Sequence, residues 1–254
     1  MWFVVGSAAA RAGFGVPGFE LDFVDRNGAV CRASLLSCSD VRFEDVRPVR
    51  SFRWPRDTDH FPGWWWWSTT SRHVGFESWL ERDHLMLLDF DPAVVAVASQ
   101  PFWLHWRGER RDRRHAPDFF ARLADGTGVV IDVRADDRIE LADAEAFETT
   151  AQACAAAGWR FRRVGLIDPA LAVNVRWLSR YRHPRCAGPA ETVGRLRQVF
   201  AEPACLSTGV AEVGDGLTVL PAVFHLMWHQ VLVADLASAP LGPSSMVRLG
   251  GDAR

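Results

Sequence analysis

The stretch HAPDFFARLADGTGVVIDVR, residues 115–134, contains two apolar strands joined by an Asp-Gly turn, the pattern of a β-hairpin. Three charged side chains accompany it: Asp118 before the first strand, Asp132 within the second, and Arg134 two residues later. Side chains two residues apart leave the same face of a sheet, so Asp132 and Arg134 are expected on one face. An acid is costly to bury in so apolar a strand unless it has a partner. The hairpin therefore predicts either a metal ion or an ion pair at Asp132.

The hairpin lies within a longer succession of helix and strand signals. The apolar spacing predicts a helix over 76–88 and two short strands within 94–108. An alanine-rich helix over 140–158 and a strand over 159–167 follow the hairpin. The order helix, strands, helix, strand predicts an α/β core built around a mixed sheet.

Three regions follow from these signals. Residues 1–60 are predicted to be a β-rich N-terminal region, with a hairpin at an Asn-Gly pair and an extended segment over 41–54. Residues 61–167 contain the core. Residues 168–254 are predicted to form a small helical domain, for which a winged helix is one candidate form. Its helices are expected over 168–182, 189–201 and 220–236, followed by a short strand over 245–250.

Composition limits the class of protein. Hydrophobic residues make up 48% and charged residues 24% of the 254 residues, and the net charge is -2. No apolar run approaches the length of a membrane span, so no membrane partner is expected, and the apolar start is interpreted as an ordinary N-terminus. Five scattered cysteines without a CxxC pair favour a reducing compartment, the cytoplasm, over a disulfide framework or a zinc site.

Arginine is distributed unevenly, and all 29 basic residues are arginine. Residues 160–200 contain nine arginines and two acids, and the segment RGERRDRRH at 107–115 contains five arginines and two acids. Such local basic surface on a mildly acidic chain indicates a polyanionic partner. The alternative is that these arginines only solvate helix faces.

The acids can form a metal site. Glu77 and Glu81 are four residues apart in the predicted helix and share a face. A helix carboxylate, Asp118 and Asp132 can converge on one divalent cation, and oxygen ligands of this kind suit Mg²⁺ or Mn²⁺. Such an ion can hold a phosphate and lower the pKa of a bound water. Arg134 would then stabilise the charge that develops in the transition state.

This arrangement resembles the PD-(D/E)xK nucleases, and among them the endonuclease subunit of heteromeric transposases, the TnsA-type family. The segments that carry the resemblance are FESWLERDHLMLLDFDPAVVAVASQPF (76–102), HAPDFF (115–120), VVIDVR (129–134), GWRFRRVG (158–165) and NVRWLSRYRHPR (174–185). The resemblance covers roughly residues 60–180. Each motif alone is weak, and the ordered set is much more specific.

The resemblance implies a restriction-endonuclease-like fold and a role for individual residues. The metal ligands would be Glu81, Asp118 and Asp132, with Glu77 as the alternative to Glu81. The lysine of the family falls on Arg134, and arginine cannot act as a general base near neutral pH. Because the chain contains no lysine at all, a tolerated replacement is favoured over a dead site.

The resemblance also implies partners: double-stranded DNA at transposon ends, a DDE-type transposase that cuts the other strand, and an ATPase regulator of transposition. Two alternatives remain open. One is a stand-alone nuclease of the restriction or repair type. The other is a DNA-binding or assembly subunit whose catalytic site has decayed at Arg134.

Three further features have competing interpretations. Gln100 could orient a water or phosphate, or it could cap a strand end. His115 could touch DNA, or it could make a structural hydrogen bond. The run Trp64–Trp67 could stack bases, but packing is favoured, with one or two tryptophans exposed.

Overall fold

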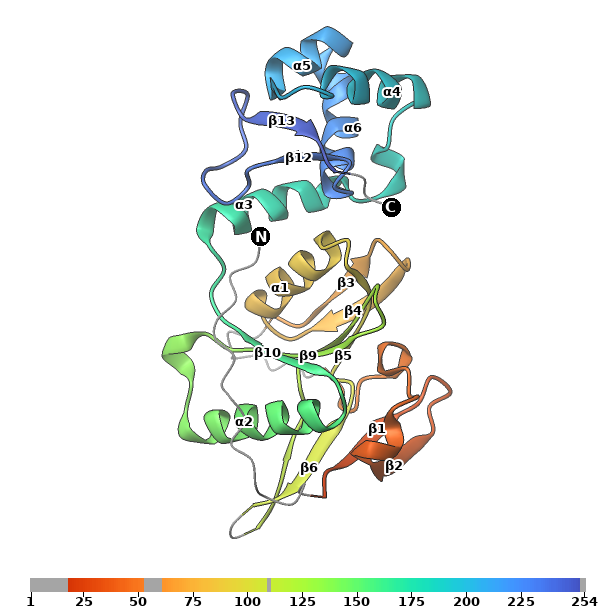
Figure 1. Cartoon of the computed structure of the whole chain (residues 1–254), viewed down its shortest axis with the longest axis vertical. Coiled ribbons are helices and arrows are strands. Elements are labelled where there is room, and N and C mark those ends of the chain that lie inside the picture. Colours follow the sequence, from red (N-terminus) through yellow and green to blue (C-terminus); the bar gives the residue numbers. More distant parts are fainter. Residues whose placement is uncertain (1–17, 53–60, 109–110, 252–254) are drawn as a thin grey trace.

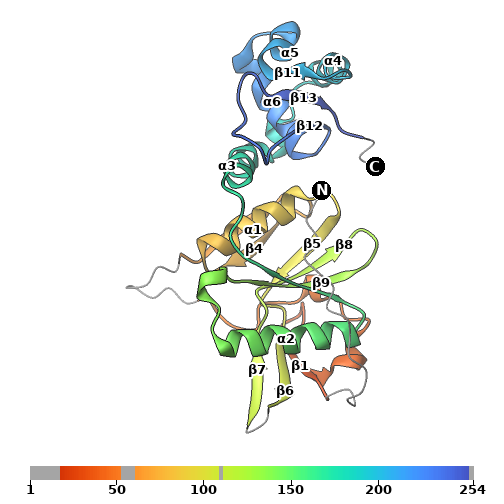
Figure 2. The same ribbon diagram turned by 60° about the vertical axis from the view of Figure 1, so that its left-hand side comes forward.

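The computed structural model describes residues 18–52, 61–108 and 111–251. These residues form a mixed α/β structure with several small sheets, one of them mixed, and six α-helices. Figures 1 and 2 show two lobes, with helix α3 (Pro169–Leu178) between them. The lower lobe contains the strands and helices that precede α3, and the upper lobe contains those that follow it.

The central sheet has the strand order β10-β9-β8-β5. Strands β5 (Val94–Ser99), β8 (Phe119–Leu123) and β9 (Gly128–Val133) are antiparallel neighbours, and β10 (Arg160–Val164) runs parallel to β9. The predicted hairpin is therefore confirmed. Its Asp-Gly turn places Gly126 at φ +86°, a conformation that glycine adopts without strain.

The two faces of this sheet are covered by different helices. Phe119 and Ile131 belong to the core on the side of α1 (Trp79–Phe90), whereas Phe120 and Val130 belong to the core on the side of α2 (Leu141–Ala156). Neighbouring residues alternate because successive side chains of a strand point to opposite faces. Helix α2 connects the parallel strands β9 and β10, which a tight turn cannot do.

Helix α1 begins later than its apolar spacing predicts. Ser78 is its N-cap, and the Ser78 hydroxyl accepts a hydrogen bond from the backbone N–H of Glu81 at 3.2 Å. Glu77 therefore precedes the helix, and the prediction that Glu77 and Glu81 share a helical face is wrong. A capping residue fixes a helix start more strongly than the spacing of apolar residues does.

The N-terminal strands share a sheet with a hairpin inserted in the core. Strands β1 (Glu20–Val24) and β2 (Val30–Ser34) join β6 (Trp103–Arg107) and β7 (Asp112–His115) in the order β2-β1-β6-β7. The short helix η1 (Leu35–Cys38) follows β2.

The extended segment predicted over 41–54 is wrong at Phe43–Asp45, which forms the 3-10 helix η2, and residues 53 and 54 lie outside the described ranges. The reason is burial of Phe43 against the rings of Phe23, Phe102 and Trp159.

The tryptophan run forms strand β3 (Gly63–Trp67), which pairs with β4 (Arg72–Phe76) in a two-stranded sheet. Trp65 and Trp67 are buried, and Trp64 is 56% exposed. The alternation of a strand explains the difference between neighbouring tryptophans. The prediction of packing with one or two exposed tryptophans is confirmed.

The upper lobe consists of short helices and a three-stranded sheet in the order β11-β13-β12. The helix predicted over 220–236 is wrong at its end, because the chain turns at Gln230 (φ +58°) and enters a strand. Helix α5 (Leu206–Val213) has no counterpart among the helices expected from the sequence. In chain order the lobe contains η4 (Ser179–Tyr181), η5 (Pro184–Cys186), α4 (Ala190–Val199), β11 (Ala204–Cys205), α5 (Leu206–Val213), α6 (Gly216–Trp228), β12 (Leu232–Ala234) and β13 (Met246–Leu249).

Within the described ranges, no single helix has both the length and the apolar character needed to cross a membrane. Only α5 and α6 taken together reach that composition, and they are bent by 119°.

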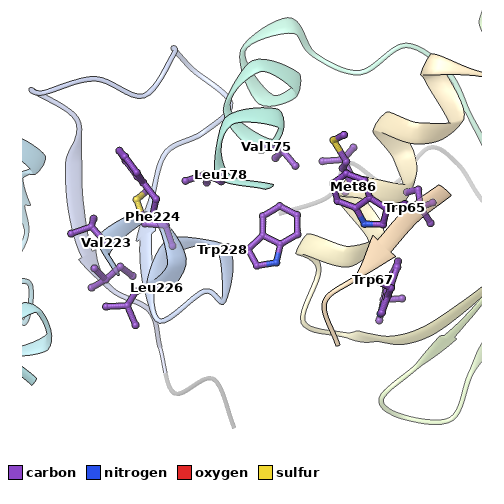
Figure 3. Close-up of a cluster of buried hydrophobic side chains, with 14 of the residues drawn as sticks. Trp65, Trp67, Met86, Val175, Leu178, Val223, Phe224, Leu226 and Trp228 are labelled. Carbon is purple, nitrogen blue, oxygen red and sulfur yellow. The ribbon is translucent and has the colours of Figure 1, made fainter. Parts of the chain in front are cut away.

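A continuous apolar core joins the two lobes (Figure 3). The ring of Trp228 on α6 lies 5.3 Å from that of Phe90 on α1, and its indole N–H donates to the Ser68 hydroxyl at 3.2 Å. The buried carboxylate of Asp89 accepts hydrogen bonds from the Trp65 indole at 2.9 Å and from the Ser68 hydroxyl at 2.8 Å. The tryptophan hairpin therefore anchors the upper lobe to α1.

Candidate functional site

A cavity of about 490 Å³ opens on the lower lobe where α1, β9 and α2 approach one another. All four predicted site residues line it, and so do Glu77 and His115. Among the described residues its charged lining consists of five carboxylates and three guanidinium groups, a formal charge of 3 − 5 = −2 without His115. These residues are Glu77, Glu81, Asp118, Asp132, Asp143, Arg50, Arg114 and Arg134.

Glu81 reaches the cavity from the first turn of α1. One carboxylate oxygen accepts from the backbone N–H of Glu77 at 2.8 Å, and the other accepts from the Ser78 hydroxyl at 2.9 Å. Glu81 and Ser78 are thus hydrogen-bonded to each other, which fixes the carboxylate against the helix start. Burial raises the pKa of Glu81, although these two hydrogen bonds partly offset the rise.

Asp118 occupies the connection between β7 and β8. Its Oδ2 accepts a hydrogen bond from the backbone N–H of Val133 at 2.7 Å, which ties this connection to the end of β9. Burial raises the pKa of Asp118 well above its ordinary value, and the charges of Glu81 and Asp132 raise it further. Three acids that repel one another in a shared cavity are typical of a site that binds a cation.

Asp132 is buried on β9, with 2% of its surface exposed. Nε2 of His115 lies 2.9 Å from Asp132 Oδ1 and 3.0 Å from Oδ2. His115 and Asp132 are therefore in direct contact. Of the two interpretations of His115, a DNA contact or a structural hydrogen bond, the structure has the hydrogen bond, and Asp132 is the partner.

Arg134 points toward α2. It leaves β9 two residues after Asp132, and its Nη2 lies 3.3 Å from Oδ1 of Asp143. Asp143 also caps α2, because its Oδ2 accepts from the backbone N–H of Glu140 at 3.2 Å. The cation of the motif therefore contacts an additional acid at the rim of the cavity.

Gln100 does not line the cavity. It follows β5 with a left-handed backbone (φ +46°), and its backbone N–H donates to the carbonyl of Asp118 at 2.8 Å. Its side-chain Oε1 is buried and has no hydrogen-bond partner among the residues that the structure describes. Gln100 thus positions Asp118 through the backbone at the end of a strand.

Three charged residues that line the cavity were not predicted. Arg50 lies with Nη2 2.6 Å from Oε2 of Glu77, and its sequence neighbourhood contains no signal for this contact. Arg114 lies 4.3 Å from the centre of the Trp103 ring and belongs to the arginine-rich segment 107–115. Asp143 could have been predicted, because it follows Glu140 at the spacing of a capping box.

The donor set fits a hard divalent cation, since the carboxylates of Glu81, Asp118 and Asp132 line one cavity whose formal charge is −2. In the described parts of the chain, however, no three side chains of the kinds that bind metals are already arranged around one point. Mg²⁺ does not require such a cage, because it keeps several waters and is bound by one or two carboxylates together with substrate phosphates. The cavity is thus compatible with Mg²⁺ or Mn²⁺.

Comparison of the chain with models of protein families and with curated proteins gives no match. The functional conclusion depends on the cavity and its residues.

Proposed function

We propose that the protein is a metal-dependent DNA endonuclease with a restriction-endonuclease-like core. The observation that supports this most is the convergence of Glu81, Asp118 and Asp132 on one cavity. Asp118 and Asp132 come from the hairpin of β8 and β9 and the connection before it, and Glu81 comes from α1, which is 37 residues before Asp118 in the sequence. The order α1, β5, β8, β9, α2, β10 agrees with the helix, strands, helix, strand order expected from the motifs.

The chemistry is hydrolysis of a phosphodiester. Asp118 would hold the cation together with Glu81 or Asp132. A bound Mg²⁺ or Mn²⁺ polarises the phosphate and lowers the pKa of a coordinated water. His115 keeps the Asp132 carboxylate in place, and the arginines of the cavity attract the phosphate backbone and offset its charge.

Action at transposon ends, with a DDE-type transposase and an ATPase regulator, is proposed on the resemblance alone. The order α4, β11, α5, α6, β12, β13 supports a winged helix for the upper lobe. A helix that reads the major groove presents polar side chains of its N-terminal turns to the bases. The exposed first turns of α6 contain no arginine or amide side chain, and the helix is buried from Ala222 to Trp228. We therefore assign this lobe to assembly with a partner, which would supply the end specificity.

A catalytically decayed DNA-binding subunit is the second candidate. It is favoured by the contact of Arg134 with Asp143, because this contact engages the guanidinium with Asp143 and not with the three predicted metal ligands. It differs from the first candidate in one respect, since it predicts DNA binding without cutting.

Nicking of supercoiled plasmid separates these candidates. With Mn²⁺ or Mg²⁺, the wild-type protein is expected to convert supercoiled DNA to the open circle, and Asp118→Ala should reduce the rate by at least about 10²-fold, since a lost metal ligand removes several kcal/mol of transition-state stabilisation. Arg72→Ala is a matched surface control, because Arg72 is an exposed arginine paired with Asp45 outside this cavity. Absence of cutting with either metal, both alone and in the presence of a DDE-type transposase partner, would contradict the nuclease.

A further inference from the structure

Arg50 is held at a fixed place relative to Asp118 by two successive backbone hydrogen bonds. The N–H of Gln100 donates to the carbonyl of Asp118 at 2.8 Å, and the N–H of Val49 donates to the carbonyl of Gln100 at 3.0 Å. The left-handed backbone of Gln100 allows both bonds at this sharp turn. Arg50 follows Val49 directly, so the N-terminal region reaches the cavity at a defined position.

The guanidinium of Arg50 enters the cavity on the side of α1. Its Nη2 lies 2.6 Å from Oε2 of Glu77, and its Nη1 lies 3.3 Å from Oε1. A guanidinium carries five N–H donors, so this pair leaves donors for a second anion. The side chain is 40% exposed, so that anion can approach from solvent.

The other two arginines of the cavity are placed differently. Arg134 contacts Asp143 on the side of α2, and Arg114 lies on the ring of Trp103. Burial raises the pKa of both Glu81 and Asp118, and the charge of Arg50 partly offsets the rise in each. Arg50 also lines the same cavity as these two acids, which would hold the cation.

We propose that Arg50 binds a non-bridging oxygen of the DNA phosphate at this site, with Glu77 orienting its guanidinium. Arginine suits this task because its planar fork matches phosphate as well as carboxylate geometry. The N-terminal region then supplies a cation that the core motifs lack on the α1 side. This inference rests on the proposed endonuclease function, since it names the group that the cavity binds.

Salt dependence of DNA binding tests the contact without cleavage. Binding of a fluorescent duplex is measured by anisotropy over a NaCl series in Mg²⁺, with Asp118→Asn present in every variant to prevent cutting. Each phosphate contact contributes about 0.9 to the slope of log K against log salt. Arg50→Ala should reduce the magnitude of that negative slope by about 0.9, because one phosphate contact is lost. Arg50→Lys should retain the slope of the parent protein, and so should Arg72→Ala.

Cleavage by the otherwise wild-type protein gives the second readout. Arg50→Ala should lower kcat roughly 10²-fold, the effect of losing one donor to a developing negative charge, and Arg50→Lys should recover part of it. If Arg50→Ala does not fold by circular dichroism, Arg50→Gln replaces it, because glutamine can still donate to Glu77 but has no charge.

The outcomes separate the two proposals. A wild-type protein that cuts DNA, combined with an unchanged slope and kcat in folded Arg50→Ala, overturns the role of Arg50 alone. A protein that never cuts, but whose slope falls in Arg50→Ala, overturns the endonuclease and supports the phosphate contact. A wild-type protein that does not bind DNA overturns both.

Discussion

Nη2 of Arg134 lies 3.3 Å from Oδ1 of Asp143, and this contact turns the cation that follows β9 toward the N-terminus of α2. The side chain is 46% exposed, so the pair sits at the rim of the cavity, where water weakens it. Asp143 is held in turn by the N–H of Glu140. The guanidinium is thus shared between the candidate site and the cap of a helix.

Replacing this arginine by lysine should increase cleavage. In Arg134→Lys, the compact ammonium can lose or donate a proton, which a guanidinium cannot do near neutral pH. We expect kcat to rise by about tenfold, less than the roughly 10²-fold or more that a fully positioned acid or base contributes. Single-turnover cleavage of a labelled duplex measures the change. Asp143→Asn in the wild-type background is the control that releases Arg134 without changing it, and a loss of activity in Arg134→Lys would show that the site is built around arginine.

The contribution of Glu81 and Asp118 to the stability of the metal-free protein should fall as the pH rises. Burial raises the pKa of Glu81 and Asp118, and neighbouring acids raise that of Asp118 further. Below about pH 4, the ordinary range of these acids, both the folded and the unfolded chain bind the protons. Above it the unfolded chain releases protons that the folded chain keeps, so the unfolding free energy decreases until the raised pKa values are passed.

Urea unfolding in EDTA between pH 4 and pH 8 checks this prediction. Asp118→Asn removes the most strongly shifted acid, so it should flatten the profile and be more stable than the wild type at pH 7.5. A wild-type profile with the same dependence on pH as that of Asp118→Asn would contradict the crowding of acids in the cavity.

Divalent cations should reverse this loss of stability. An ion that binds only the folded chain at a concentration of 100 Kd adds about 2.7 kcal/mol to the unfolding free energy. Mg²⁺ or Mn²⁺ should therefore raise the melting temperature of the wild type at pH 7.5, and the rise should be absent in Asp118→Asn. His73→Ala, at an exposed position of β4, serves as the control that should keep the full shift. An equal shift in Asp118→Asn would place the bound ion elsewhere.

The sequence predicts the parts of the site that depend on local pattern. Period-two alternation and an Asp-Gly turn were enough to predict the hairpin of β8 and β9, and the same period placed Asp132 and Arg134 on one face. The family register selected Glu81, and all of these side chains line the cavity. The apolar spacing was less successful at the start of α1, where the Ser78 cap overrides it.

Contacts between distant segments could not be predicted in this way. Arg50 and Glu77 are 27 residues apart, and β1 pairs with β6 across the whole of the intervening chain. These contacts depend on how the N-terminal region packs on the core, which no local period encodes. The apolar run at 220–236 was also ambiguous, because a buried helix and a buried strand can have the same composition.

Removal of the His115 imidazole should destabilise the protein most when no metal is present. Asp132 is buried, and both of its oxygens lie within 3.0 Å of His115 Nε2. In His115→Ala the carboxylate loses this partner, and an unsatisfied buried acceptor costs about 1–3 kcal/mol. Saturating Mg²⁺ should shrink the loss, because an ion that reaches Asp132 neutralises the same charge.

Urea unfolding with EDTA and with Mg²⁺ measures the loss of unfolding free energy under both conditions. The control His73→Ala, at an exposed position, should change each value by less than about 0.5 kcal/mol. An equal loss under both conditions would mean that the ion does not reach Asp132, which would leave Glu81 and Asp118 as its ligands.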